Sequence, residues 1–272
     1  MKYYPAVDVA GASSDRLVAF VDDFGPTAIE ERSETTRIFF ATAAERDRAF
    51  SGIASRFDVT AIDVADEDWA RRSQENLQPV TVGRITVAPP WAPAPVPVPP
   101  TNLWIVIEPS MGFGTGHHAT TRLCLSALQA IDLTEALVLD VGTGSGVLAI
   151  AAGRLGATRA HGVDCDADAI QSARENLRRN PQAALVTFDV ADLTTARLSR
   201  ADVVTANLTG ALLVRSAPAL IAALTPGGSL VVSGLLSHER ADVVAACAPA
   251  RVVWEQEEDG WVGLTIGGTD LR

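Results

Sequence analysis

The stretch from residue 135 to residue 164 constrains the fold of this chain more than any other part of it. An apolar run leads to Asp140, and a pattern typical of a helix begins at Val147. Between them, three glycines fall on alternate positions: Gly142, Gly144 and Gly146. Glycine lets a backbone turn sharply and approach a ligand, and the helix that follows offers its first N–H groups. A second predicted strand then ends at Asp164, whose carboxylate can accept hydrogen bonds from both hydroxyls of a ribose. The sequence therefore predicts a βαβ unit that binds a nucleoside.

The first quarter of the chain predicts a separate, smaller unit. Its pattern gives the order βαββαβ, with strands expected at 2–9, 27–32, 36–41 and 58–64 and helices at 13–24 and 43–56. This order is typical of a ferredoxin-like α+β fold. A short helix is expected to begin at Asp66, and the proline-rich run at 88–100 favours a stiff spacer. We therefore expect a ferredoxin-like domain at 1–65, a connecting helix and linker at 66–100, and a larger domain at 101–272.

Beyond residue 100, predicted strands and helices alternate. Strands are expected at 103–107, 136–139, 159–163, 184–188, 201–205 and 229–235, with helices between them and a closing hairpin within 250–266 that turns at 259–260. This pattern predicts an α/β domain with a mostly parallel, doubly wound sheet and a late antiparallel strand. Ligands of such sheets bind beyond the carboxyl ends of the strands. Four polar or glycine positions fall at such ends: Gly142, Asp164, Asp189 and Asn207.

Composition narrows the classes of partner. The formal net charge of −11 argues against direct nucleic-acid binding, which needs clustered cations, and favours a basic substrate. The three cysteines are scattered without metal-ligand spacing, so no metal site is expected. No apolar stretch is long enough to cross a membrane, and the first residues do not resemble a secretory signal. We expect a cytoplasmic protein, and a monomer.

The spacing of the glycines bears on which nucleoside is bound. The dinucleotide fingerprint is G-x-G-x-x-G, whereas this chain reads D-x-G-x-G-x-G from Asp140 and has Val147 in the place of the third fingerprint glycine. The pattern resembles the first motif of class I S-adenosylmethionine (SAM) methyltransferases. A nicotinamide-dependent oxidoreductase remains an alternative at this point.

Further motifs resemble one family, the PrmA methyltransferases of ribosomal protein L11. They are DEDW at 66–69, QPVTVG at 78–83, FGTGHHATT at 113–121, DVGTGSG at 140–146, GVD at 162–164, ANL at 206–208, PGG at 226–228 and SGL at 233–235. The resemblance implies an N-terminal domain that holds the substrate protein and a C-terminal Rossmann-like domain that binds SAM. It implies cofactor contacts at Phe113, Thr121, Gly142, Asp164 and Asn207, to which we add Gly144, Gly146 and Asp189 from the strand ends and the glycine turn.

The resemblance also implies the reaction, which is N-methylation of lysine ε-amino groups, of an N-terminal α-amino group, or of both, with L11 as the substrate. Asn207 and the backbone carbonyl of Leu208 are the expected catalytic groups, because both can accept hydrogen bonds from the amine. His117 is a weaker candidate for a general base. The chain departs from the family pattern on the substrate side of the glycine-rich loop, for example at Ala119. Another protein or a small amine, a nucleobase amine, and a SAM-binding protein without turnover are the alternatives.

Overall fold

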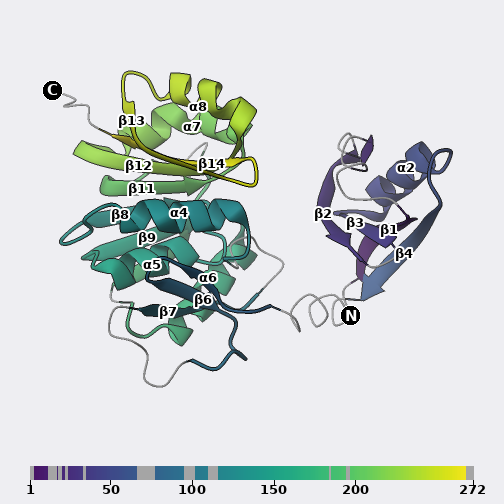
Figure 1. The fold of residues 1–272 in the computed structure, drawn as a ribbon, viewed down its shortest axis with the longest axis horizontal. Helices are drawn as coiled ribbons and strands as arrows, with labels where there is room; N and C mark the ends of the chain where they lie inside the picture. The colour runs from purple at the N-terminus through teal and green to yellow at the C-terminus, as the bar shows by residue number, and fades with distance from the viewer. Residues whose placement is uncertain are drawn as a thin grey trace. The chain divides into compact units, whose positions relative to one another are not determined.

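The structure is a computed structural model, and it describes residues 3–11, 17, 20–21, 24–32, 35–65, 77–94, 102–109, 116–183, 185–193 and 197–267. The chain divides into two compact units, Met1–Asn76 and Leu77–Arg272 (Figure 1). Each unit has buried clusters of its own, because the apolar residues of the first pack together in two groups and those of the second in two others.

The first unit has an antiparallel sheet with the strand order β2-β3-β1-β4. Its described elements are β1 (Tyr3–Ala10), β2 (Pro26–Glu31), β3 (Thr35–Phe40), α2 (Ala43–Ile53) and β4 (Val59–Ala65). Helix α2 begins with a capping box, in which Thr42 and Glu45 each accept a backbone N–H of the other residue. Residues 17, 20 and 21 of the predicted first helix are helical, Phe24 at its end has 3₁₀ geometry, and the other residues of this helix lie outside the described residues. The strand order is that of a ferredoxin-like sheet.

The second unit is built on a seven-stranded sheet with the order β10-β9-β8-β11-β12-β14-β13. The strands are β8 (Leu137–Val141), β9 (Arg159–Asp164), β10 (Val186–Val190), β11 (Ala201–Asn207), β12 (Leu224–Leu236), β13 (Arg251–Glu258) and β14 (Trp261–Gly267). The first five in this order run parallel, and β14 is antiparallel to both of its neighbours. The prediction of a doubly wound, mostly parallel sheet with a late antiparallel strand is confirmed.

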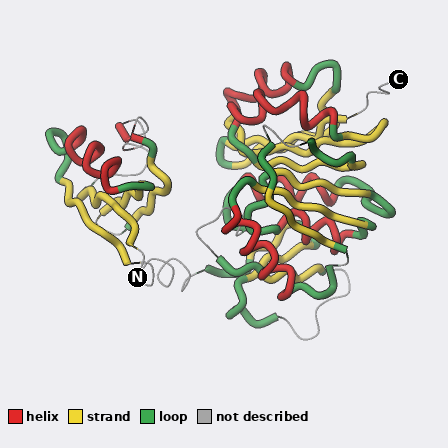
Figure 2. Tube along the Cα trace, turned by 180° about the vertical axis from the view of Figure 1, so that it is seen from behind, coloured by secondary structure: helices red, strands yellow, loops and turns green. Residues whose placement is uncertain are grey.

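Helices cover this sheet from both sides (Figure 2). They are α4 (Ala119–Gln129), α5 (Val147–Leu155), α6 (Ala167–Arg179), α7 (Gly210–Ala222), a 3₁₀ turn at Ser237–Glu239 and α8 (Arg240–Ala246). Apolar residues of α4, α5 and α6 pack with Val138 and Val203 in one buried cluster, and those of α7 and α8 pack with Leu139 and Val204 in another. Successive residues of β8 and β11 therefore point alternately into the two cores, as expected for a sheet buried on both faces. Among the described residues, no helix is long and apolar enough to span a membrane.

A small sheet that the sequence did not predict belongs to the second unit. Its order is β5-β6-β7, formed by β5 (Val80–Val82), β6 (Ile85–Ala88) and β7 (Leu103–Val106). Strands β5 and β6 fall within the segment that we expected to be connecting helix and linker. Ile85 and Val87 are at most 1% exposed and belong to the core on the α4–α6 side, so this hairpin is part of the folded unit. We had expected the division between the units at the proline-rich run. It lies before that run, at 76/77. The helix expected at Asp66 lies outside the described residues.

Candidate active site

A glycine turn follows strand β8. Gly142, Gly144 and Gly146 all have positive φ angles, of 70°, 53° and 81°, which residues with a side chain rarely adopt. The N–H groups of Gly142 and Thr143 donate to the carbonyl of Val163 on β9, at 2.9 and 3.0 Å. A Cβ atom on Gly142 would lie 2.5 Å from Cδ2 of Leu208, so the turn passes close to the end of β11. The glycines thus let the turn bend between two strand ends.

Asp140, on the strand that leads into this turn, holds the turn in place. Its carboxylate is 1% exposed and accepts hydrogen bonds from the hydroxyls of Thr143 in the turn and Thr205 on β11, each at 2.6 Å. Burial raises the pKa of Asp140, and the two hydroxyl donors oppose that rise. The residue ties the turn to the neighbouring strand, which makes it a support for the site rather than a ligand contact.

Asp164 lies at the end of β9 and faces the turn. Its Oδ2 accepts the N–H of Gly144 at 3.0 Å, and its Oδ1 accepts the N–H of Asp166 at 3.1 Å. Each carboxylate oxygen has two lone pairs, so each can accept a further hydrogen bond from a ribose hydroxyl. The structure therefore brings the predicted ribose acceptor into direct contact with the glycine turn.

Asn207 and Leu208 lie where β11 ends. The N–H of Leu208 donates to the carbonyl of Ser233 on β12 at 3.0 Å. Gly234 packs against the Leu208 peptide so closely that a Cβ atom there would lie 2.3 Å from the Leu208 carbonyl oxygen, and its φ of 90° also suits glycine. The position of the predicted catalytic carbonyl is therefore set by the neighbouring strand.

A pocket of about 240 Å³ opens beside this strand end. It is lined by His118, Thr120, Asn207, Leu208, Thr209, Leu212, Gly234 and Trp261. The His118 ring packs edge-on against Trp261, with 5.0 Å between ring centroids. Its Nδ1 lies 2.8 Å from the Thr120 hydroxyl and accepts the Thr120 N–H at 3.3 Å, which caps helix α4. Burial first, and then the positive charge of Arg122, lowers the pKa of His118. The pocket thus has aromatic and aliphatic walls with a few polar groups.

Of the residues that line this pocket, the sequence predicted Asn207 and Leu208 as site residues and missed the others, among them the two aromatic walls His118 and Trp261. Trp261 begins β14, more than fifty residues beyond Asn207, and no local pattern connects the two. Arg122 connects the start of helix α4 to the closing hairpin. Its guanidinium donates to Glu258 of the hairpin, at 2.8 Å, and to the carbonyl of His117. The sequence signal was the His117–His118 pair itself, of which the structure places the second residue in the pocket. His117 instead has its Nε2 2.9 Å from the carbonyl of Gln78.

The remaining predicted residues differ in their placement. Thr121 is fully buried in the first turn of α4, and its hydroxyl has no hydrogen-bond partner among the described residues. Phe113 lies outside the described residues. Asp189 is two-thirds exposed on β10, and its carboxylate lies 3.6 Å from Arg174 and 3.8 Å from His161. In the sheet, Asp189 pairs with Val163, directly before Asp164, so it lies at the same edge as the glycine turn, and its contact with the cofactor stays a prediction.

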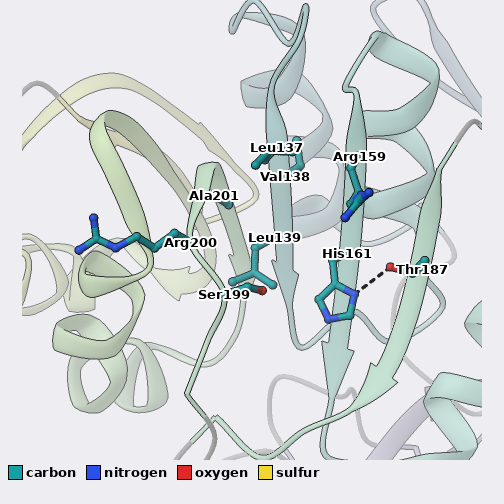
Figure 3. A pocket seen from close by; sticks show the side chains of 9 residues that line it. All are labelled: Leu137, Val138, Leu139, Arg159, His161, Thr187, Ser199, Arg200 and Ala201. Atoms are coloured by element: carbon teal, nitrogen blue, oxygen red, sulfur yellow. Dashed lines mark hydrogen bonds between the residues drawn. The ribbon is translucent and has the colours of Figure 1, made fainter.

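A second pocket, of about 220 Å³, lies elsewhere on the sheet (Figure 3). Its lining includes Leu137, Arg159 and Ala201, which are the first residues of β8, β9 and β11. It therefore lies at the amino ends of parallel strands, away from the ends where ligands of such sheets bind. The His161 ring in it makes a cross-strand hydrogen bond of 2.9 Å to the Thr187 hydroxyl, which is typical of a solvated sheet face.

The residues at the carboxyl ends fit SAM as a ligand. Gly142 has a left-handed φ and passes close to the Leu208 side chain, the Asp164 carboxylate has free lone pairs, and the buried Thr121 hydroxyl has no partner in the described part of the chain. A doubly wound parallel sheet with this turn and this acid defines the class I SAM-dependent methyltransferases, and the protein is one of them.

Comparison with known proteins gives the family. The family model "Ribosomal protein L11 methyltransferase (PrmA)" matches residues 27–267. The L11 methyltransferase of Deinococcus radiodurans is 40% identical over 220 residues, which are 79% of this chain and 78% of the relative. That of Pseudomonas aeruginosa is 36% identical over 268 residues, covering 96% and 89%. A crystal structure of ribosomal protein L11 methylase from Lactobacillus delbrueckii subsp. bulgaricus aligns with a TM-score of 0.62 at 25% identity, covering 71% of this chain and 98% of that one. The chain belongs to the ribosomal protein L11 methyltransferase (PrmA) family.

Proposed function

We propose that this methyltransferase transfers the methyl group of SAM to amines of ribosomal protein L11, on lysine side chains, on the N-terminal α-amine, or on both. The relatives that share most of its length carry L11 methyltransferase in their names. The observation that carries the proposal is the pocket beside Asn207 and Leu208, which opens next to the glycine turn and has the chemistry of an amine site.

The walls of this pocket suit the stem of a lysine. Leu208, Leu212 and Trp261 offer apolar surface to a chain of four methylene groups, which lysine buries readily while its head stays polar. Asn207 supplies a side-chain oxygen and Leu208 a backbone carbonyl, both of which accept hydrogen bonds from an amine. These two acceptors would fix the direction of the nitrogen lone pair, and alignment of this kind is a large part of catalysis by positioning.

The amine must be neutral to act as a nucleophile. SAM supplies an electrophilic methyl group on a sulfonium, and the protein therefore needs to deliver an uncharged nitrogen. None of the described residues that line the pocket is acidic, so a lysine that enters it loses water without gaining a counter-charge. Such desolvation lowers an amine pKa from its solution value of about 10.4. His118, rather than His117, is the ring that faces this amine site.

The test is incubation of the purified protein with SAM and with L11 of the same organism, followed by intact-mass and peptide mass spectrometry. Mass gains in steps of one methyl on lysine or on the N-terminus are expected, and the modified peptides identify the amines. An Asn207→Ala variant tests the pocket: with SAM raised to saturation, it should transfer methyl groups at least about tenfold more slowly than wild type, because it loses an uncharged acceptor for the amine. No gain with wild type, despite measured SAM binding, would refute L11 as substrate and favour another protein or a small amine.

A further inference from the structure

Two buried asparagines, one in the last turns of helix α6 and one at its C-cap, complete the edge of strand β7. Asn176 and Asn180 are 1% and 2% exposed. The side chain of Asn180 accepts the N–H of Val106 at 2.9 Å and donates to the carbonyl of the same residue at 2.7 Å. The side chain of Asn176 accepts the N–H of Glu108 at 2.9 Å. Because β6 takes the other edge of β7, these two amides supply the hydrogen bonds that a further strand would make.

The match has a simple geometric cause. Four residues along an α-helix advance by about 6 Å, and two residues along a strand advance by nearly the same distance, about 6.6 Å. Two side chains four residues apart, those of Asn176 and Asn180, can therefore reach backbone groups two residues apart in the extended segment, those of Glu108 and Val106. A buried amide that satisfies backbone groups in this way is expensive to remove, because its partners stay buried.

Asn176 makes one contact that Asn180 lacks. Its Nδ2 donates to the carbonyl of Ser145 at 2.9 Å. Ser145 lies inside the glycine turn, between Gly144 and Gly146, and is itself 2% exposed. One side-chain amide thus joins the end of β7 to the turn, and its donor fixes the direction of the peptide plane between Ser145 and Gly146. The contacts of Asn180, by comparison, go to β7 and to the carbonyl of Asn176 on its own helix.

We propose that Asn176 is a positioning residue for SAM, which holds the glycine turn in its binding conformation through the Ser145 carbonyl. Peptide planes in a turn with three left-handed glycines have little side-chain packing to fix them, because glycine has none. Without the amide of Asn176, the buried Ser145 carbonyl would lose this hydrogen bond, and the peptide between Ser145 and Gly146 would be held less firmly in its present direction. The N–H of Gly144, which contacts Asp164, belongs to the same turn and would lose its direction as well.

Asn180 provides a matched control, because it is equally buried, caps the helix that contains Asn176 and bonds to the same extended segment, two residues before Glu108. We would measure the dissociation constant of SAM by isothermal titration calorimetry and Tm by calorimetric scanning, for Asn176→Ala and Asn180→Ala in the full chain. Both variants should lower Tm. Asn176→Ala should raise the dissociation constant of SAM about tenfold or more, since a lost buried hydrogen bond in the site carries that weight, and Asn180→Ala less than twofold.

A second pair covers the case in which an alanine variant fails to fold. Asn176→Asp keeps the acceptor for the Glu108 N–H and replaces the donor to Ser145 by an oxygen, and Asn180→Asp makes the same exchange against Val106. The expected result is again weaker SAM binding for the Asn176 variant alone. Equal losses of SAM affinity in the two variants of either pair, or unchanged affinity in the Asn176 variants, would overturn the proposal. SAM binding is measured without any methyl acceptor, so this test does not depend on the identity of the substrate.

Discussion

Thr121 combines complete burial with a hydroxyl that has no partner in the described part of the chain. A buried hydroxyl without a hydrogen bond is costly, and native proteins keep few of them. Its neighbour Thr120 lines the pocket beside Asn207, and its hydroxyl is paired with His118. The family resemblance implies that Thr121 contacts SAM, and an orphaned donor and acceptor is what such a residue shows before its ligand arrives. We therefore attribute the cost of the buried, unpaired Thr121 hydroxyl to its expected role in binding SAM.

Replacement of Thr121 by valine tests this reading. Valine has the same shape and needs no hydrogen bond, so Tm of Thr121→Val should equal or exceed that of wild type. The dissociation constant of SAM should rise by about two- to tenfold, the range expected for one lost hydrogen bond. Thr205→Val is the control, because its hydroxyl is paired with buried Asp140 and its loss should lower the free energy of unfolding by about 2 kcal/mol. Unchanged SAM affinity in Thr121→Val would exclude the contact.

The lowered pKa of His118 makes a prediction about pH. Because the folded pKa lies below the unfolded value of about 6.5, the unfolded chain binds more protons in the window between the two values. Stability should therefore fall as pH decreases through about 6.5 towards the folded pKa. His118→Gln should lose this part of the pH dependence, so the difference in Tm between pH 7.5 and pH 5.5 should be smaller than in wild type. An identical difference in both proteins would show that the ring is not held neutral by burial.

Local sequence predicts the residues of the glycine turn better than those of the pocket beside Asn207 and Leu208. Gly142, Asp164 and Asn207 could be found because each stands at the end of a predicted strand, and parallel strands bring their carboxyl ends together. Trp261 could not be found in this way. It reaches the pocket through the closing hairpin, which is held by the ion pair between Arg122 and Glu258, 136 positions apart. Asp189 follows the strand-end rule as well, because it pairs with Val163 beside Asp164, and its carboxylate lies 3.6 Å from Arg174.

At the scale of elements, strand β12 shows how a strand sets the position of the Leu208 carbonyl, the group that we propose to be catalytic. Gly227 and Gly234 both lie on β12 with positive φ, of 81° and 90°. A Cβ atom at Gly227 would meet nothing within 4 Å, whereas one at Gly234 would lie 2.3 Å from the Leu208 carbonyl oxygen. The two glycines thus have the same backbone requirement and differ in what they pack against.

Alanine at each glycine separates strain from displacement. Both variants pay for a left-handed residue with a Cβ atom, about 1–2 kcal/mol of stability. Gly234→Ala must also move the Leu208 peptide, so it should lose more stability than Gly227→Ala and should lower kcat for methyl transfer about tenfold or more. Gly227→Ala should keep kcat within about twofold of wild type. Equal kcat values in the two variants would mean that the Leu208 carbonyl has no part in the reaction.

The periodicity of the sequence predicts most elements within a few residues and misses their long-range partners. The strands expected at 159–163 and 201–205 are found with slightly later ends, because the sheet ladder continues as far as Asp164 and Asn207. Strand β12 begins at Leu224, before the Pro226–Gly228 segment that we expected to separate helix from strand. Strand β7 was expected at 103–107, but its sheet with β5 and β6 escaped prediction, because β5 and β6 have only three and four residues and the proline-rich run separates β6 from β7 in sequence.

At the scale of the whole molecule, the small sheet decides where the chain can be divided. The second unit starts at Leu77, and the buried residues Ile85 and Val87 of β6 belong to its core. Strand β6 also pairs with β7, whose other edge is held by α6. A truncation that removes β6 would therefore expose apolar core and leave β7 with an unpaired edge. A truncation at 76/77 leaves both clusters of the second unit complete.

We expect the first unit to select the protein substrate, and two truncations test this. Deletion of residues 1–76 should leave a folded protein that binds SAM with an affinity within about twofold of the full chain, because the residues predicted to contact SAM and their supports lie beyond Leu77. Methylation of L11 should fall at least about a hundredfold in kcat/KM, since the contacts of a whole domain are lost. Deletion of residues 1–87 should unfold or aggregate, because it removes Ile85 and Val87 from the core. If the first truncation methylates L11 as fast as the full chain, the smaller unit has another purpose. If it no longer binds SAM, the two units are not independent, and the loss of methylation would say nothing about substrate selection.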